Sequence, residues 1–250
     1  MELDMKASQE GTIEIENRGS VRILTMCRPD KNNRVTQAMA EHATLAFEAA
    51  RIEKSVSGVV LTGYGDVFCT GGDYLSAGGT SEGRLGFARA FSDMERAMTR
   101  LGKPLVGANN GNTHAGGFSL LTACDLAVTH EDATFGLPEI AHGLFPFLAL
   151  AIVKDSLPKK VLWDMVYRAR LLSAAEAQQF YLVNEIVPKD SVLERAVELA
   201  ACTARWNRDI VSLGRDLYYN TRCSNPTEAV EQSRFALIAA LKAMDESGLG

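Results

Sequence analysis

Alternating apolar and polar residues near the N-terminus predict a β-hairpin. Residues 13–15 and 21–26 alternate in this way around a turn at 17–20. Thr36 is then typical of a helix N-cap, and an apolar stripe of helical spacing follows it and ends near Ser55. We expect this stripe to face the core; its members are Ala38, Met39, His42, Ala43, Leu45, Ala46 and Ala49.

Three further apolar runs, at 58–62, 104–108 and 126–129, predict strands. The β-α-β order predicts a parallel sheet with helices packed outside it. Strand, turn and helix recur at a spacing that favours stacked β-β-α units, although no strict sequence repeat is visible. Before the second run lies a stripe of helical spacing that we expect to pack in the core: Leu85, Phe87, Ala88, Phe91, Met94, Ala97, Met98 and Leu101. A loop rich in glycine and short polar residues is predicted at 77–83.

Helical patterns dominate the second half of the chain, from Leu148 onward. The last predicted helix, at 226–245, places apolar residues on one face, and together with Leu193, Val197 and Leu199 this is more apolar surface than a small appendage needs. Contact between subunits is the expected use of that surface. We therefore expect a frayed N-terminus at 1–10, a spiral core at 11–190 and a helical oligomerisation region at 191–250.

Composition and charge narrow the function classes. A formal charge of −5 gives no global reason to bind nucleic acid or an anionic membrane. No apolar run reaches the length of a membrane span, and the acidic start predicts neither a secretory signal nor a transit peptide. Five cysteines without CxxC spacing indicate free thiols in a reducing compartment, so a cytoplasmic location is expected. The sequence contains no dense cluster of His, Cys and Asp, so it does not predict a metal site.

Two glycine turns and one carboxylate carry the candidate chemistry. The turns are Thr70-Gly71-Gly72-Asp73 and Ala115-Gly116-Gly117, each after an apolar strand-like run. Glycine lets backbone N–H groups approach a carbonyl oxygen closely, and two such donors can hold the oxygen of a thioester enolate. Glu139 stands among apolar residues, where poor hydration raises a carboxyl pKa toward the range useful for acid/base catalysis.

The order of motifs resembles the crotonase superfamily of enoyl-CoA hydratases and isomerases, from about Ile13 to Val187. The resemblance is carried by Arg28-Pro29 with Asn33, Phe68-Cys69-Thr70-Gly71-Gly72-Asp73, Ala115-Gly116-Gly117-Phe118-Ser119 leading into Ala123-Cys124-Asp125-Leu126, Ala133-Thr134-Phe135-Gly136-Leu137-Pro138-Glu139 with Gly143, and Leu172-Ser173-Ala174-Ala175-Glu176-Ala177 running to Pro188. It implies an α/β crotonase (ClpP-like) fold, in which a stacked β-β-α spiral core precedes a C-terminal helical region. It also implies a homotrimer or a pair of trimers.

The resemblance also implies roles for individual residues. Gly72 and Gly116 would donate to the thioester oxygen, and Glu139 would move the proton. Coenzyme A would arrive as part of an acyl-CoA substrate, with no prosthetic group, and its contacts would include Asn33, Arg34, Gly71 and Asp73. Two of these residues have alternative roles. Arg34 either pairs with a CoA phosphate or points to solvent. Asp73 either contacts the substrate or caps the backbone of the first turn.

Several other side chains have two possible roles. Tyr74, Phe118, Phe145 and Phe147 are candidate walls of an acyl pocket, or ordinary core. Cys69 is either a nucleophile or a small apolar residue that lines the first turn. His114 and His142 either complete a hydrolytic triad with Ser119 or make packing and hydrogen-bonding contacts.

Ser119 is where the chain departs from the hydratases, whose first catalytic Glu would fall at this position. Serine is a poor base at neutral pH unless another group activates it. A single carboxylate favours an enoyl-CoA double-bond isomerase. Hydration remains the alternative, with Ser119 helping to position water, and hydrolysis or decarboxylation is a smaller one. The non-enzymatic alternative is a relative that has lost catalytic activity and that binds CoA or supports an assembly.

Overall fold

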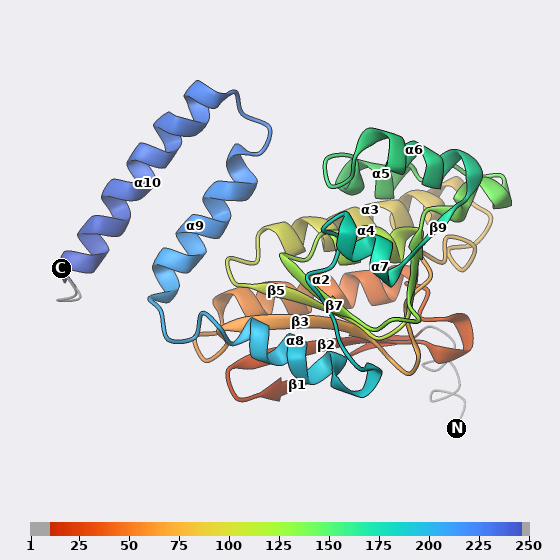
Figure 1. Ribbon diagram of the computed structural model, residues 1–250, viewed down its shortest axis with the longest axis horizontal. Helices are drawn as coiled ribbons and strands as arrows, with labels where there is room; N and C mark the ends of the chain where they lie inside the picture. The colour runs from red at the N-terminus through yellow and green to blue at the C-terminus, as the bar shows by residue number, and fades with distance from the viewer. Residues whose placement is uncertain (1–10, 247–250) are drawn as a thin grey trace.

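Two β-sheets and the helices around them form the core of the protein (Figure 1). The computed structural model describes residues 11–246. Residues 1–10, expected to be frayed, lie outside that range. Among the described residues, no helix combines the length and the apolar character needed to cross a bilayer.

The larger sheet has six strands in the order β1-β2-β3-β5-β7-β10. Its strands are β1 (Thr12–Arg18), β2 (Val21–Cys27), β3 (Gly58–Gly63), β5 (Leu105–Asn109), β7 (Leu126–Thr129) and β10 (Glu185–Ile186). The predicted hairpin is confirmed, since β1 and β2 pair antiparallel, and every later pairing is parallel. All six residues of β3 are buried, as expected for a parallel strand covered on both faces.

The smaller sheet has four strands in the order β4-β6-β8-β9. They are β4 (Val67–Cys69), β6 (Asn112–His114), β8 (Thr134–Gly136) and β9 (Leu171–Ser173). Along the chain, β3, β5 and β7 of the larger sheet are each followed by a strand of the smaller sheet and then by a helix. These successive turns confirm the predicted stacked β-β-α spiral.

The helices cover the sheets and extend the chain beyond them. The α-helices are α2 (Gln37–Ile52), α3 (Ser81–Thr99), α4 (Gly116–Thr122), α5 (Phe147–Val153), α6 (Lys159–Arg168), α7 (Ala174–Gln179), α8 (Val192–Ala200), α9 (Arg208–Thr221) and α10 (Pro226–Glu246). Three short 3₁₀ helices are η1 (Pro29–Lys31), η2 (Pro138–His142) and η3 (Lys189–Ser191). The predicted N-cap is confirmed, because the Thr36 hydroxyl accepts the N–H of Met39 at 3.2 Å.

Several details of the predicted helices were wrong. Leu85 of α3, expected to pack in the core, is 50 % exposed. In α2 the buried face includes Ala40, Phe47 and Ala50, whereas Leu45 is 64 % exposed. The alanines around Leu45 made two helix faces look equally apolar, so the pattern selected the wrong edge of the stripe. The loop predicted at 77–83 ends earlier, because the Thr80 hydroxyl accepts the Gly83 N–H at 3.1 Å and α3 begins at Ser81.

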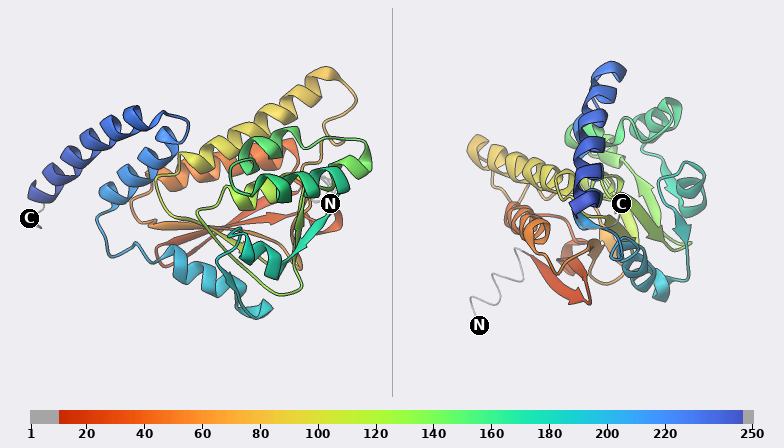
Figure 2. Two further views of the ribbon diagram at one scale, coloured as in Figure 1. Left: turned by 45° about the horizontal axis from the view of Figure 1, so that its top comes forward. Right: turned by 90° about the vertical axis from the view of Figure 1, so that its left-hand side faces the viewer.

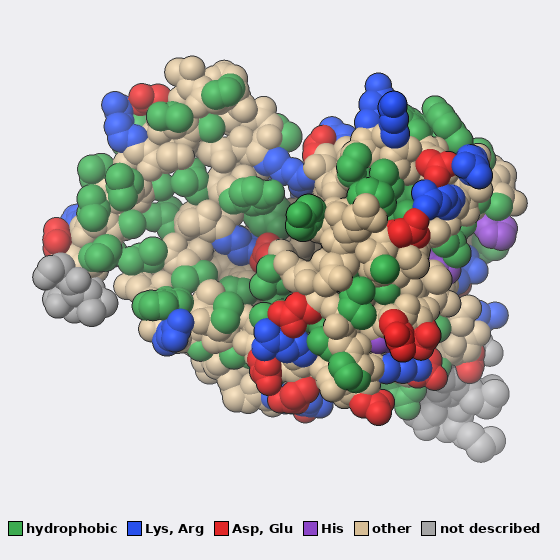
Figure 3. Space-filling model, in the orientation of Figure 1, with side chains coloured by type: hydrophobic (Ala, Val, Ile, Leu, Met, Phe, Trp, Pro, Cys, Tyr) green, Lys and Arg blue, Asp and Glu red, His purple; other side chains and the backbone are tan. Residues whose placement is uncertain are grey.

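The last two helices lie at one end of the molecule. Figures 1 and 2 show α9 and α10 as a helical hairpin beside the sheets, with α10 packed along α9. Hydrophobic side chains gather over this hairpin in the space-filling view (Figure 3). Those exposed on α10 are Val230, Phe235, Leu237, Ile238 and Leu241.

Candidate active site

The two glycine turns meet at the ends of neighbouring strands of the smaller sheet. The first follows β4 and the second follows β6, which pairs with β4 in parallel. A Cβ atom built on Gly116 would lie 3.3 Å from the backbone nitrogen of Gly72. One built on Gly71 would lie 3.4 Å from the nitrogen of Gly116. The backbone nitrogens of Gly72 and Gly116 therefore border one small space, which any side chain at these turns would fill.

Neither of these two N–H groups donates to an acceptor within residues 11–246. Gly71 has a φ of +115°, a conformation that L side chains rarely adopt, so glycine is required there. The first turn is tied to the preceding loop, because Val35 donates to Gly71 O at 2.9 Å and Asp73 donates to Val35 O at 2.7 Å. These bonds leave the Gly72 N–H available for a ligand.

The second turn contains a strained residue. Ala115 has a φ of +52°, and a non-glycine residue in such a conformation costs about 1–3 kcal/mol unless its surroundings hold it. Its N–H donates to Gly136 O at 2.8 Å, and its carbonyl accepts the N–H of Phe118 at 3.0 Å. Strain of this kind is common where a backbone is prepared to bind a ligand.

A cavity of about 290 Å³ opens over both turns, and its lining is mostly apolar. Gly72, Gly116 and Glu139 all lie in its wall. Of the four aromatic residues proposed as pocket walls, Tyr74, Phe145 and Phe147 line the cavity, whereas Phe118 is fully buried in the core. Phe87 and Phe91 of α3, predicted as core, also line it. A hydrophobic acyl chain matches such a lining.

Glu139 is positioned by the short helix η2, where it follows Pro138. Its Oε2 atom is buried and has no hydrogen-bond partner in the described part of the chain. Burial raises the pKa of Glu139 to about 7 from an ordinary 4.5. A carboxyl group with these properties, in the same cavity as two free N–H donors, is suited to taking and returning a proton near neutral pH.

Ser119 lies outside the cavity wall and is fully buried in α4. Its hydroxyl oxygen is 2.7 Å from Oε1 of Glu95 and 2.8 Å from the carbonyl oxygen of Gly116. Glu95 was missed by sequence reasoning. The signal was available, because Glu95 follows Phe91 by four residues and so lies on the same buried face of α3.

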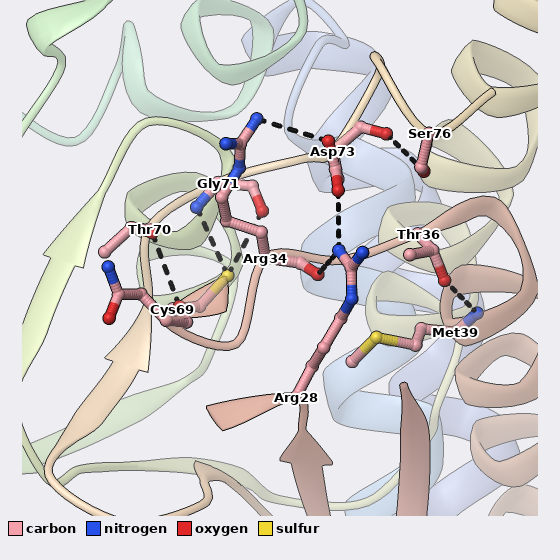
Figure 4. A network of polar contacts seen from close by, with 10 residues as sticks. Arg28, Arg34, Thr36, Met39, Cys69, Thr70, Gly71, Asp73 and Ser76 are labelled. Atoms are coloured by element: carbon pink, nitrogen blue, oxygen red, sulfur yellow. Dashed lines mark hydrogen bonds and ion pairs between the residues drawn. The ribbon is translucent and has the colours of Figure 1, made fainter. Parts of the chain in front are cut away.

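Asp73 lies behind the first turn in an ion-pair network (Figure 4). Its Oδ2 is 2.6 Å from Nη1 of Arg28, and its Oδ1 is 3.4 Å from Nη2 of Arg34. The Arg34 side chain keeps about a third of its surface exposed. Asn33 is fully buried, and its amide group donates to the carbonyls of Tyr64 and Val67. This network fixes the loop after β2 against the first turn.

Other candidate residues have different partners. His114 Nε2 is 2.9 Å from the Thr134 hydroxyl, and burial lowers the pKa of His114. His142 is exposed at the end of η2. Burial raises the pKa of the Cys69 thiol to about 12, so this thiol is neutral at physiological pH and a weak nucleophile. Within residues 11–246 no group of three or more His, Cys, Asp or Glu side chains could hold a metal ion.

Comparison with known proteins places the chain in a family. The family model described as enoyl-CoA hydratase/isomerase matches residues 16–246. Mevalonyl-coenzyme A hydratase sidH of Aspergillus fumigatus is 30 % identical over 225 residues, which cover 83 % of this chain and 78 % of the relative. 2,3-Dehydroadipyl-CoA hydratase of Escherichia coli is 32 % identical over 190 residues, covering 74 % and 72 %.

A crystal structure of enoyl-CoA hydratase from Mycobacterium smegmatis superposes with a TM-score of 0.86 at 25 % identity, covering 92 % of this chain and 90 % of that one. The chain therefore belongs to the enoyl-CoA hydratase/isomerase family of the crotonase superfamily, and it is an enzyme of that family.

Proposed function

We propose that the protein binds an enoyl-CoA thioester and moves its double bond through an enolate, with Glu139 as the single acid/base. One observation carries this proposal: among the described residues that line the cavity, Glu139 is the one acidic side chain. Coenzyme A enters and leaves as part of the substrate, and the partly exposed guanidinium of Arg34 is the candidate contact for one of its phosphates.

The reaction balances with one base. Ionised Glu139 removes a proton from C2 of a 3-enoyl thioester, and the electron pair moves onto the carbonyl oxygen. The N–H groups of Gly72 and Gly116 hold that oxyanion, and each such donor commonly contributes two to three orders of magnitude to the rate. The enolate then collapses while Glu139 returns the proton to C4, which gives the 2-enoyl thioester.

Hydration of a 2-enoyl thioester is the second candidate, and the names of the relatives favour it. Both curated relatives described above are called hydratases. In that reaction water would add its oxygen at C3 and a proton would be added at C2. The site would have to bind and activate a water molecule with Glu139 as the one carboxylate among the described residues that line the cavity.

Product analysis separates the two candidates. The protein is incubated with 2-enoyl and 3-enoyl CoA thioesters of matched chain length, and the products are identified by NMR. A 2-enoyl product from the 3-enoyl thioester supports isomerisation. Formation of a 3-hydroxyacyl thioester from the 2-enoyl compound, without isomerisation of the 3-enoyl one, would assign hydration instead.

The pH dependence of turnover reports the ionisation of Glu139. Because the ionised form takes the proton, kcat/KM rises with pH through about 7. On this acidic limb, kcat/KM should fall roughly tenfold for each pH unit below the midpoint. The exposed Glu131→Gln variant should keep the same acidic limb. A midpoint near 4.5, the ordinary value, would show that the carboxyl group is hydrated in the working enzyme.

We also propose that residues 191–250 form an oligomerisation region and that the protein assembles as a homotrimer or a pair of trimers. The exposed apolar side chains of α10 support this, because exposed apolar residues that gather on one part of a protein surface mark a contact site. Sedimentation of the full-length protein should give a multiple of three times 27.1 kDa.

Replacing Ile238 and Leu241 together by Ser should shift sedimentation toward smaller species, whereas Leu45→Ser, an equally exposed site on α2, should not. A wild-type protein that sediments as a monomer at micromolar concentration would contradict the proposed assembly.

A further inference from the structure

Glu95 is a buried carboxyl group that the proposed reaction leaves unused. It is 6 % exposed and lies on α3 one helical turn after Phe91. Phe91 lines the cavity and reaches Gly116, since a Cβ atom built on that glycine would lie 2.8 Å from the tip of the Phe91 ring. Glu95 is therefore placed behind the second glycine turn, outside the cavity wall.

The hydroxyl of Ser119 makes two short contacts but has one hydrogen. The carbonyl of Gly116, at 2.8 Å, can only accept a hydrogen bond. An ionised Glu95, at 2.7 Å, can also only accept. Both contacts become hydrogen bonds when Glu95 carries a proton, because Glu95 then donates to Ser119 and Ser119 donates to Gly116. The geometry therefore favours a protonated Glu95.

The electrostatic surroundings agree with this assignment. Burial raises the pKa of Glu95 to about 7, against the opposing effect of a hydrogen bond from Ser119. Helix α4 has no charged residue, and within residues 11–246 no cation pairs with Glu95. The cations near α3 have other partners: Arg51 of α2 faces Asp216, Arg215 of α9 faces Asp125, and Arg96 faces Asp93. The remaining charged groups beside the α2–α3 contact line two surface grooves, with Glu48 and Arg100 in one and Glu41 and Arg89 in the other. Glu139 lies in the cavity wall, of which Glu95 is not a part.

The chain of hydrogen bonds ends on the turn that presents the Gly116 N–H. Ser119 bonds back to Gly116 across the first turn of α4, directly after the strained Ala115. A strained backbone persists when several interactions hold it at once. If Glu95 ionised, Ser119 would turn toward the carboxylate, the Gly116 carbonyl would lose this partner, and a negative charge would lie behind the oxyanion site.

We propose that Glu95 is a positioning residue of the second oxyanion turn, which in its protonated form holds the Ser119 hydroxyl on the carbonyl oxygen of Gly116. The proposal rests on the proposed enolate chemistry for its effect on rate. Ser119 occupies the position where the hydratases have a catalytic glutamate. In this protein the carboxyl group comes from Glu95 of α3, and it acts through Ser119.

The first test follows the proton directly, without turnover. Full-length protein is labelled with ¹³C at glutamate side-chain carboxyls, and the Glu95 resonance is identified by its absence from Glu95→Gln. We expect a protonated carboxyl at pH 6 that titrates near 7. An ionised Glu95 at pH 6 would overturn the assignment, whatever substrate the enzyme uses.

The second test measures the pH profile of kcat. Wild type should lose activity as Glu95 ionises, and Glu95→Gln, whose amide still donates to Ser119, should lack this alkaline limb. Ser119→Ala removes the bond to Gly116 and should lower kcat roughly tenfold with little change in KM. Glu95→Ala removes the partner that holds the Ser119 hydroxyl in place, so it should lower kcat by no more than this. Because Glu95 acts through Ser119, the double variant should lose no more than Ser119→Ala alone. Asp93→Asn, an exposed carboxylate on the same helix, should match wild type.

An alkaline limb that persists in Glu95→Gln, or losses that multiply in the double variant, would refute the positioning role. A wild-type enzyme that turns over no thioester would instead count against the proposed function, while the carboxyl titration would still decide where the proton lies. The two failures are therefore distinguishable.

Discussion

Glu139→Gln is expected to lower turnover by about 10²–10⁴-fold, the usual contribution of a general base, while CoA thioester affinity stays nearly unchanged. Glutamine keeps the shape of the side chain but has no basic oxygen that can take a proton from C2. Because the thioester is held by the apolar lining of the cavity and by the N–H groups of Gly72 and Gly116, which the substitution leaves in place, the ground-state complex should lose little. Steady-state kinetics and calorimetric titration with a non-reactive acyl-CoA measure the two quantities separately.

A matched carboxylate controls for charge. Glu131 is exposed in the turn before β8, eight residues from Glu139, and Glu131→Gln should match wild type. If Glu139→Gln retained full activity, Glu139 would not be the base. If it lost affinity as much as turnover, the residue would instead help to bind the thioester.

Gly116→Val is expected to abolish productive binding of acyl-CoA. The first atom of the new side chain would lie 3.3 Å from the Gly72 nitrogen, in the space where the thioester oxygen is expected. The rest of the valine would extend further into that space and shield both N–H donors. Loss of one donor alone commonly lowers kcat by about 10²–10³-fold, and loss of the space for the carbonyl should also weaken binding.

The fold should tolerate this change, because the closest contact of the new Cβ is the tip of the Phe91 ring, at 2.8 Å, and that ring can move. Thermal unfolding checks this. Gly214→Val, on an exposed part of α9 where a Cβ meets nothing within 4 Å, is the matched control for binding. Tight acyl-CoA binding by a folded Gly116→Val protein would show that the thioester lies elsewhere.

The architecture could be predicted from sequence because its signals are local and repeated. The apolar run that became β3 is buried along its whole length, and each glycine turn follows its strand directly. The approach of the two glycine turns to one another could also be predicted, since the order of motifs resembled that of a known family. The buried face of α2 could not be predicted, because alanine packs on either face of a helix and the position of Leu45 did not show which face is buried.

The site was only partly accessible to sequence reasoning. Glu139 was identified because its apolar neighbours are adjacent in sequence, whereas Glu95 becomes significant only when α3 meets α4, twenty-four residues later in the chain. Phe87 and Phe91 were assigned to the core because helical spacing identifies an apolar face and not whether that face borders a cavity. For Asp73, the bonds to Arg28 and Arg34 depend on a contact across about forty residues, which no local motif predicts.

Exchange of substrate protons with solvent tests the central claim most directly. Saturated, 2-enoyl and 3-enoyl CoA thioesters are incubated in D₂O with wild type and with Glu139→Gln, and deuterium is located by NMR and mass spectrometry. The proposed enolate predicts Glu139-dependent double-bond movement, with deuterium at C2 or C4 wherever the proton held by Glu139 exchanges with solvent before it is returned. Absence of both exchange and double-bond movement with every thioester, in a protein that binds CoA measurably, would contradict enolate formation at this site.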